Sequence, residues 1–179
     1  MSGTAVAVFG SSRTEPNSPA WSVAKDVGAR LANAGMAVIT GGYGGTMEAA
    51  SEGASENGGH VIGVVAPTLF PDRTGANDHV AEVIEAEDLL DRIDQMIRRA
   101  GGVIALPGSI GTAAELILAW NHNFLSRRNG YPVLPTVAVG ESWRALSTTM
   151  LSEIAAEPGD IYLADDHAEA LEWLLPRLP

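Results

Sequence analysis

Short apolar segments alternate with longer amphipathic segments along the whole chain. The apolar segments span residues 4–9, 36–40, 61–65, 80–86, 103–106, 134–139 and 161–163. Such continuous runs are typical of strands buried on both faces, and the segments between them repeat their apolar residues with the period of a helix. The pattern predicts an α/β protein, a Rossmann-like doubly wound parallel sheet with helices on both faces, joined by right-handed crossovers.

The 179 residues carry no linker, repeat or low-complexity run, so we expect a single nucleotide-binding domain over residues 1–179. One stretch, from Ala66 to His79, is less regular and contains two prolines and Gly75. Loops of this length in compact domains are usually functional or mobile.

Three turns rich in glycine or serine follow predicted strands, at residues 10–12, 41–45 and 107–112. Ligands of open α/β sheets bind beyond the carboxyl ends of the strands, and glycine turns before a helix present N–H groups to phosphate. A single turn of this kind is equally well explained as a tight strand-to-helix connection, but three favour a ligand. The predicted phosphate- and nucleotide-binding residues are Ser11, Ser12, Gly41, Gly42, Gly44, Gly45, Pro107, Gly108, Ser109, Gly111 and Thr112.

The spacing of these glycines excludes two common nucleotide sites. No turn keeps the G-x-G-x-x-G spacing of dinucleotide-binding folds. No G-x-x-x-x-G-K-[ST] occurs either, since the only lysine, Lys25, lies inside a predicted helix. A site for a mononucleotide remains compatible with these turns.

Two charged residues on predicted helices, Glu115 and Arg92, need separate consideration. Glu115 lies in the first turn of a helix predicted from Thr112 to about Ser126, which is apolar on almost every side and is therefore expected to be deeply buried. There it is either the partner of Thr112 in a capping box or a catalytic carboxylate facing the pocket. Arg92 lies at the margin of an apolar helical stripe, where an ordinary solvated arginine is the simpler interpretation.

The run from Pro107 to Glu115, PGSIGTAAE, resembles the P-G-G-x-G-T-x-x-E motif of the LONELY GUY (LOG) family. The run from Gly41 to Ala50 is similar to a second motif of that family. The resemblance implies cytokinin riboside 5′-monophosphate phosphoribohydrolase-like activity, the hydrolysis of a nucleoside 5′-monophosphate to free base and ribose 5-phosphate. It also implies that Arg92 and Glu115 are the catalytic pair, that the ligand is AMP-like, and that no cofactor is needed.

Several family expectations concern details of the site. Ser109 and Tyr43 each stand where the family has glycine, and the long segment from Pro67 to His79 is expected to shape the base pocket. Many relatives are labelled lysine decarboxylases, but a pyridoxal enzyme needs a Schiff-base lysine near its site loops, and Lys25 is not placed there.

A second function, of a different class, is a non-catalytic nucleotide or molybdenum-cofactor-like carrier or sensor, which resembles this chain in fold and glycine motifs. Retention of both Arg92 and Glu115 favours the enzyme. A metal hydrolase is disfavoured and no metal site is predicted, because the four histidines show no paired ligand spacing.

The amino-acid composition limits the classes of partner that this protein is expected to bind. The net charge of −11 disfavours polymeric nucleic acid, and the chain has no cysteine. No secretion signal or membrane-spanning apolar stretch is evident, which predicts a cytoplasmic protein without a membrane partner. The apolar helix from Thr112 has more hydrophobic surface than one sheet face covers, so a homodimer is expected.

Overall fold

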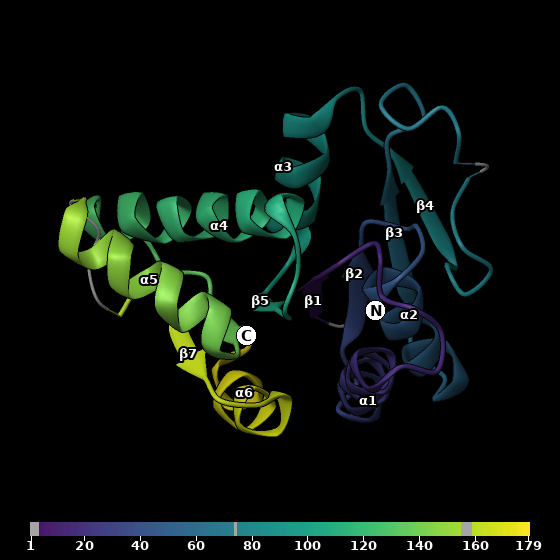
Figure 1. Cartoon of the computed structure of the whole chain (residues 1–179), viewed down its shortest axis with the longest axis horizontal. Coiled ribbons are helices and arrows are strands. Elements are labelled where there is room, and N and C mark those ends of the chain that lie inside the picture. The colour runs from purple at the N-terminus through teal and green to yellow at the C-terminus, as the bar shows by residue number, and fades with distance from the viewer. Residues whose placement is uncertain (1–3, 74, 155–158) are drawn as a thin grey trace.

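The computed structural model describes residues 4–73, 75–154 and 159–179, in which strands and helices alternate except where the fourth strand follows the third with no helix between them (Figure 1). The strands are β1 (Ala5–Phe9), β2 (Ala37–Thr40), β3 (Val61–Val65), β4 (Glu82–Glu85), β5 (Gly102–Ala105), β6 (Thr136–Val139) and β7 (Tyr162–Ala164). The helices are α1 (Pro19–Asn33), α2 (Thr46–Glu56), α3 (Leu89–Arg99), α4 (Ile110–Arg128), α5 (Glu141–Glu153) and α6 (His167–Leu174), followed by a short 3-10 turn (Leu175–Arg177).

All seven strands form one parallel sheet in the order β4-β3-β2-β1-β5-β6-β7. The chain builds outward from the central β1 to β4 and then returns to place β5 on the other side of β1. The strand order therefore reverses between β1 and β5, which is where doubly wound sheets form ligand crevices. The predicted fold is confirmed.

Helices cover both faces of the sheet (Figure 1). Residues of α1, α2 and α6 pack with Val6, Val8 and Val38 in one core cluster. Residues of α3, α4 and α5 pack with Ala7 and Ile39 in the other. Successive residues of β1 thus face opposite layers, as the two-residue period of a strand requires.

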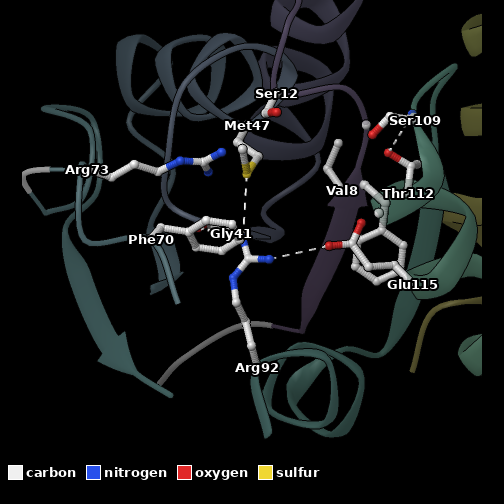
Figure 2. A pocket seen from close by; sticks show the side chains of 13 residues that line it. Val8, Ser12, Gly41, Met47, Phe70, Arg73, Arg92, Ser109, Thr112 and Glu115 are labelled. Atoms are coloured by element: carbon white, nitrogen blue, oxygen red, sulfur yellow. Dashed lines mark hydrogen bonds and ion pairs between the residues drawn. The ribbon is translucent and has the colours of Figure 1, made fainter. Parts of the chain in front are cut away.

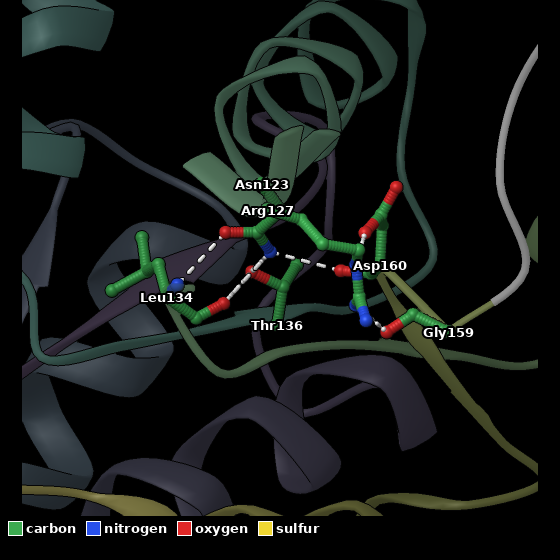
Figure 3. Close-up of polar contacts among 6 residues, drawn as sticks. All are labelled: Asn123, Arg127, Leu134, Thr136, Gly159 and Asp160. Carbon is green, nitrogen blue, oxygen red and sulfur yellow. Dashed lines mark hydrogen bonds and ion pairs between the residues drawn. The ribbon is translucent and has the colours of Figure 1, made fainter. Parts of the chain in front are cut away.

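The far half of α4 is fixed by a buried polar network (Figure 3). The Asn123 side-chain amide donates to the Leu134 carbonyl, to the Thr136 hydroxyl and to the Asp160 carbonyl, and its oxygen accepts from the Leu134 N–H. Arg127 adds an ion pair of 2.7 Å to the Asp160 carboxylate. Because α4 carries Thr112 and Glu115 at its other end, these bonds to the start of β6 and to the residues just before β6 and β7 hold the helix in place.

Helix α4 differs from its prediction in two respects. It begins at Ile110 rather than Thr112, because Ser109 is the N-cap residue. It was also expected to be deeply buried, but only one side packs on the sheet, and Ile110, Ile117 and Leu125 are 86%, 37% and 48% exposed. Among the described residues, no helix combines the length and apolar character needed to cross a membrane.

Candidate active site

A cavity of about 200 Å³ lies where the chain leaves β1, β2 and β5 (Figure 2). The three predicted turns therefore meet, because the carboxyl ends of adjacent parallel strands share one edge of the sheet. The lining residues are Val8, Phe9, Gly10, Ser12, Gly41, Met47, Phe70, Arg73, Arg92, Ser109, Gly111, Thr112 and Glu115.

Arg92 enters this cavity from α3 and is 5% exposed, so its interpretation as a solvated surface arginine is wrong. Its Nε donates to the Val64 carbonyl at 2.8 Å, and Nη2 donates to the Gly41 carbonyl at 2.9 Å. These carbonyls end β3 and begin the turn after β2, so the sheet itself aims the guanidinium. Nη1 is left to face the cavity.

Gly41 is required by the path of Arg92. A Cβ at this position would lie 1.7 Å from Arg92 Nη2 and 2.6 Å from the Met47 sulfur. The absence of a side chain at Gly41 therefore makes room for the arginine, a reason that the glycine pattern alone did not reveal.

Glu115 faces Arg92 across the floor of the cavity, with 3.6 Å between Oε1 and Nη1. Its side chain is 13% exposed. Burial raises the pKa of Glu115 to about 7, although the nearby charge of Arg92 acts in the opposite direction. A carboxyl group with a pKa near neutrality can exchange a proton at physiological pH, as a general acid or base must.

The capping interpretation of Glu115 is wrong. Thr112, which was expected to be the N-cap, is the third residue of α4, and its Oγ1 accepts from the Ser109 N–H at 3.3 Å. The cap therefore pairs Ser109 with Thr112 and leaves Glu115 one turn further along, on the same face as Gly111 and Thr112. A structural reason for this carboxylate is thereby removed.

The N-terminus of α4 forms the other polar part of the cavity. Ser109, Gly111 and Thr112 line it, and the first N–H groups of a helix have no partner within the helix. The 19-residue helix also directs the positive end of its dipole there. This end suits an anion such as a phosphate.

Six of the predicted nucleotide-binding residues do not line the cavity: Ser11, Gly42, Gly44, Gly45, Pro107 and Gly108. Several of them shape the turns. Gly42 and Gly45 have positive φ, and the Ser11 carbonyl accepts from the Thr46 N–H at 2.9 Å. Gly108 makes room for Thr112, whose Oγ1 would lie 2.2 Å from a Cβ at position 108.

Three side chains that were not predicted contribute to one end of the cavity: Met47, Phe70 and Arg73. Phe70 and Arg73 belong to the segment expected to shape the base pocket, and that expectation agrees with the cavity. Tyr43 lies beneath them, 4% exposed, with its hydroxyl accepting from the Ala66 N–H at 2.8 Å. No periodicity could identify Phe70 and Arg73, because they lie on an irregular segment.

Metal ligands are not gathered in the described ranges 4–73, 75–154 and 159–179, where no three histidine, aspartate or glutamate side chains form a metal-binding group. Two histidines instead lie within ion-pair distance of a carboxylate, His60 with Glu82 and His167 with Asp26, each at 3.0 Å.

The part of the chain that forms this cavity matches a known protein family. The model of the SLOG cluster4 family matches residues 3–125, which include all the lining residues of the cavity. The chain belongs to this LOG-type family. The predicted LOG resemblance is thereby confirmed.

The names of similar proteins point to two different functions. A probable cytokinin riboside 5′-monophosphate phosphoribohydrolase of Oryza sativa is 34% identical over 64% of this chain and 51% of its own length. The chain thus spans about half the length of that curated relative. The molybdenum cofactor binding protein of Rippkaea orientalis has a similar structure (TM-score 0.74, 22% identity, 96% of this chain and 95% of that chain). The molybdenum cofactor carrier protein of Chlamydomonas reinhardtii has a TM-score of 0.69 at 25% identity, over 97% and 99% of the two chains.

Proposed function

We propose that this protein hydrolyses the N-glycosidic bond of a nucleoside 5′-monophosphate. The observation that carries the proposal is the Arg92–Glu115 pair, held 3.6 Å apart in the same cavity as the N-terminus of α4. The curated relative of rice supports the same reaction class. A carrier needs an anion site but has no use for a buried carboxylate with a pKa near 7.

The phosphate would bind Ser12, Ser109, Gly111 and Thr112, which offer hydroxyl groups and the backbone donors of a helix N-terminus. This placement brings the ribose toward Glu115, one helical turn from Thr112. The carboxylate would then lie beside C1′, where positive charge develops as the glycosidic bond breaks.

The reaction balances with water alone. The C1′–N bond breaks and its electron pair leaves with the base, which takes up a proton. Ionised Glu115 removes a proton from water as the water oxygen bonds to C1′. Arg92 would hold Glu115 in position and favour its ionised form, because the charge of the guanidinium lowers the carboxyl pKa.

The experiment that tests this proposal incubates the purified protein with AMP, IMP, GMP and CMP and measures free base and ribose 5-phosphate by chromatography. We expect base release by the wild type and a loss of at least about a hundredfold in Glu115→Gln. The matched control is Glu172→Gln, which changes an exposed glutamate on α6 and should retain activity. Absence of base release across the panel contradicts the proposal.

A second candidate function is a nucleotide or molybdenum-cofactor-like carrier. The similarity to the Chlamydomonas carrier over 97% of this chain favours it. Tight binding of a nucleotide by the wild type, with no turnover of any monophosphate, would support the carrier instead of the enzyme.

We further propose a homodimer that covers the outer sides of α3 and α4. Leu90 is 68% exposed and Leu125 is 48% exposed. Both line a groove whose other lining residues are the apolar Ile93, Ile97 and Leu118 and the polar Asp94, Asn121 and His122. Light scattering at micromolar concentration should give twice the chain mass; a monomeric mass contradicts the dimer.

A further inference from the structure

The cavity has two chemically different ends (Figure 2). Ser109 and Thr112 lie on one side of the view and Arg73 and Phe70 on the other, with Arg92 and Glu115 between them. A nucleotide with its phosphate at α4 and its C1′ beside Glu115 therefore directs its base toward Arg73. The inference below rests on this placement, and thus on the proposed function.

Arg73 is held by aromatic rings. Its guanidinium carbon lies 4.2 Å from the centre of the Phe70 ring and 4.6 Å from that of Tyr43, and these two rings meet edge to face. Cation–π contacts of this kind orient a guanidinium without using its N–H donors. Among the described residues the guanidinium of Arg73 contacts only these two rings and no hydrogen-bond acceptor, so its N–H donors can reach a ligand.

The contrast with Arg92 supports this assignment. Arg92 donates hydrogen bonds from Nε and Nη2 to main-chain carbonyls, and its Nη1 faces the Glu115 carboxylate. Arg73 contacts no carboxylate among the described residues, although it lies close enough to Arg92 for the two charges to repel. Arg73 is half-buried, so solvent can serve its N–H groups in the empty cavity, and a ligand with acceptors can take the place of that solvent.

The other side chains at this end determine what that acceptor is. Phe70 and Met47 offer apolar surface that suits the flat face of a base, while Arg73 offers hydrogen-bond donors at its edge. Within the described lining of this end, no carboxylate or side-chain amide accepts a hydrogen bond. A base that presents acceptors along one edge is therefore matched, and a base that presents an amino group there is not.

We propose that Arg73 selects 6-oxopurine nucleotides by donating two hydrogen bonds to the O6 and N7 atoms of the base. Guanine and hypoxanthine carry two adjacent acceptors at these positions, whereas adenine replaces O6 with an amino donor. Arginine is the side chain whose fork matches this pair of acceptors. Inosine and guanosine monophosphates are then the preferred substrates, and AMP is a poor one.

The test compares IMP with AMP, which differ in the group at C6, an oxygen in IMP and an amino group in AMP, and in the proton that only IMP carries on N1. For the wild type we expect kcat/KM for IMP to exceed that for AMP by about tenfold or more. In Arg73→Gln this ratio should fall to about one, because an amide can pair with either base. Arg73→Lys keeps the charge without the fork and should also lose most of the preference.

The control variant is Arg128→Gln, the same change at an exposed arginine at the far end of α4, which should leave the ratio unchanged. Circular dichroism and thermal melting check that each variant is folded. A wild type with no preference for IMP overturns the proposal, and so does a preference that survives Arg73→Gln. Equal weakening of IMP and AMP by Arg73→Gln would assign Arg73 to the phosphate and overturns it too.

Binding separates this proposal from the hydrolysis proposal. Calorimetry with Glu115→Gln, alone and combined with Arg73→Gln, measures the affinities for IMP and AMP without turnover. If the wild type releases no base but these variants show a preference for IMP that depends on Arg73, the specificity proposal stands and only the hydrolysis proposal is refuted. Failure of both nucleotides to bind overturns both proposals.

Discussion

The buried Glu115 should make the protein less stable as the pH rises, and Glu115→Gln should remove that effect. The pKa of Glu115 is about 7 in the folded protein, against an ordinary value of 4.5. Below about pH 4.5 the carboxyl group is protonated in both states and contributes no difference. Between 4.5 and 7 the unfolded chain releases this proton while the folded chain retains it, so rising pH favours unfolding.

The magnitude follows from the two pKa values. One pKa unit corresponds to about 1.36 kcal/mol, so the ionised carboxylate lowers the free energy of unfolding by about 3 kcal/mol above pH 7. The attraction of Arg92 is already included, because it acts on the folded pKa. A glutamine resembles the protonated carboxyl group at every pH. The variant should therefore match the wild type near pH 4.5 and exceed it by about 3 kcal/mol at pH 8.5.

Urea denaturation monitored by tryptophan fluorescence at pH 5, 6, 7 and 8.5 measures this difference. Typical domains have a free energy of unfolding of about 5–15 kcal/mol, so a difference of about 3 kcal/mol between two variants is large enough to measure. Glu172→Gln, which changes an exposed side chain, should show no widening gap. A gap for Glu115→Gln that is independent of pH, or that narrows as pH rises, refutes the reasoning that burial governs this carboxyl group.

Three further predictions concern the same framework. The kcat/KM for a nucleoside monophosphate should rise with pH around a midpoint near 7, as Glu115 ionises. Arg92→Gln should move that midpoint upward by about one pH unit or more, because the positive charge that favours the ionised carboxylate is lost. An unmoved midpoint in a pH–rate profile contradicts this coupling. Gly41→Ala should displace Arg92, since its Cβ would lie 1.7 Å from Nη2, and should lower kcat/KM by about a hundredfold. Gly44→Ala is the matched control, because its new Cβ would lie 3.6 Å from the nearest neighbour, Glu48 Oε2; equal activities of the two variants would oppose this role. Asn123→Ala deletes four hydrogen bonds and should cost about 2–4 kcal/mol of unfolding free energy; a loss below about 1 kcal/mol in urea denaturation would show that the network does not fix α4.

The fold could be predicted from the sequence because local pattern and tertiary environment agree. Runs such as Val61–Val65 are apolar at almost every position, and the parallel sheet buries such strands from both sides. The start of α4 was misplaced by two residues because Ser109 and Thr112 are both competent caps. Only the three-dimensional path of the turn decides between them.

The site could be predicted in part, for a related reason. Spacing located the turns that follow β1, β2 and β5, and the parallel sheet brings them together. Spacing could not show that Arg92 turns inward, because its helical position borders both the core and the solvent. Arg92 donates hydrogen bonds to the main-chain carbonyls of Val64 and Gly41, which hold its side chain in the cavity. Main-chain groups have no sequence signature.

The two arginines of the cavity show how chemistry and specificity can be divided in this fold. Arg92 is fixed by carbonyls at the ends of two strands, so any change to its surroundings alters the sheet. Arg73 is held on an irregular segment by ring contacts alone among the described residues, and a change there leaves the strands untouched. Rigid elements position reacting groups more accurately than loops, whereas loops accept substitution at little cost to stability. In the proposed assignment, Arg92 and Glu115 on the helices serve the hydrolysis, while Arg73, on the segment after β3, selects the base.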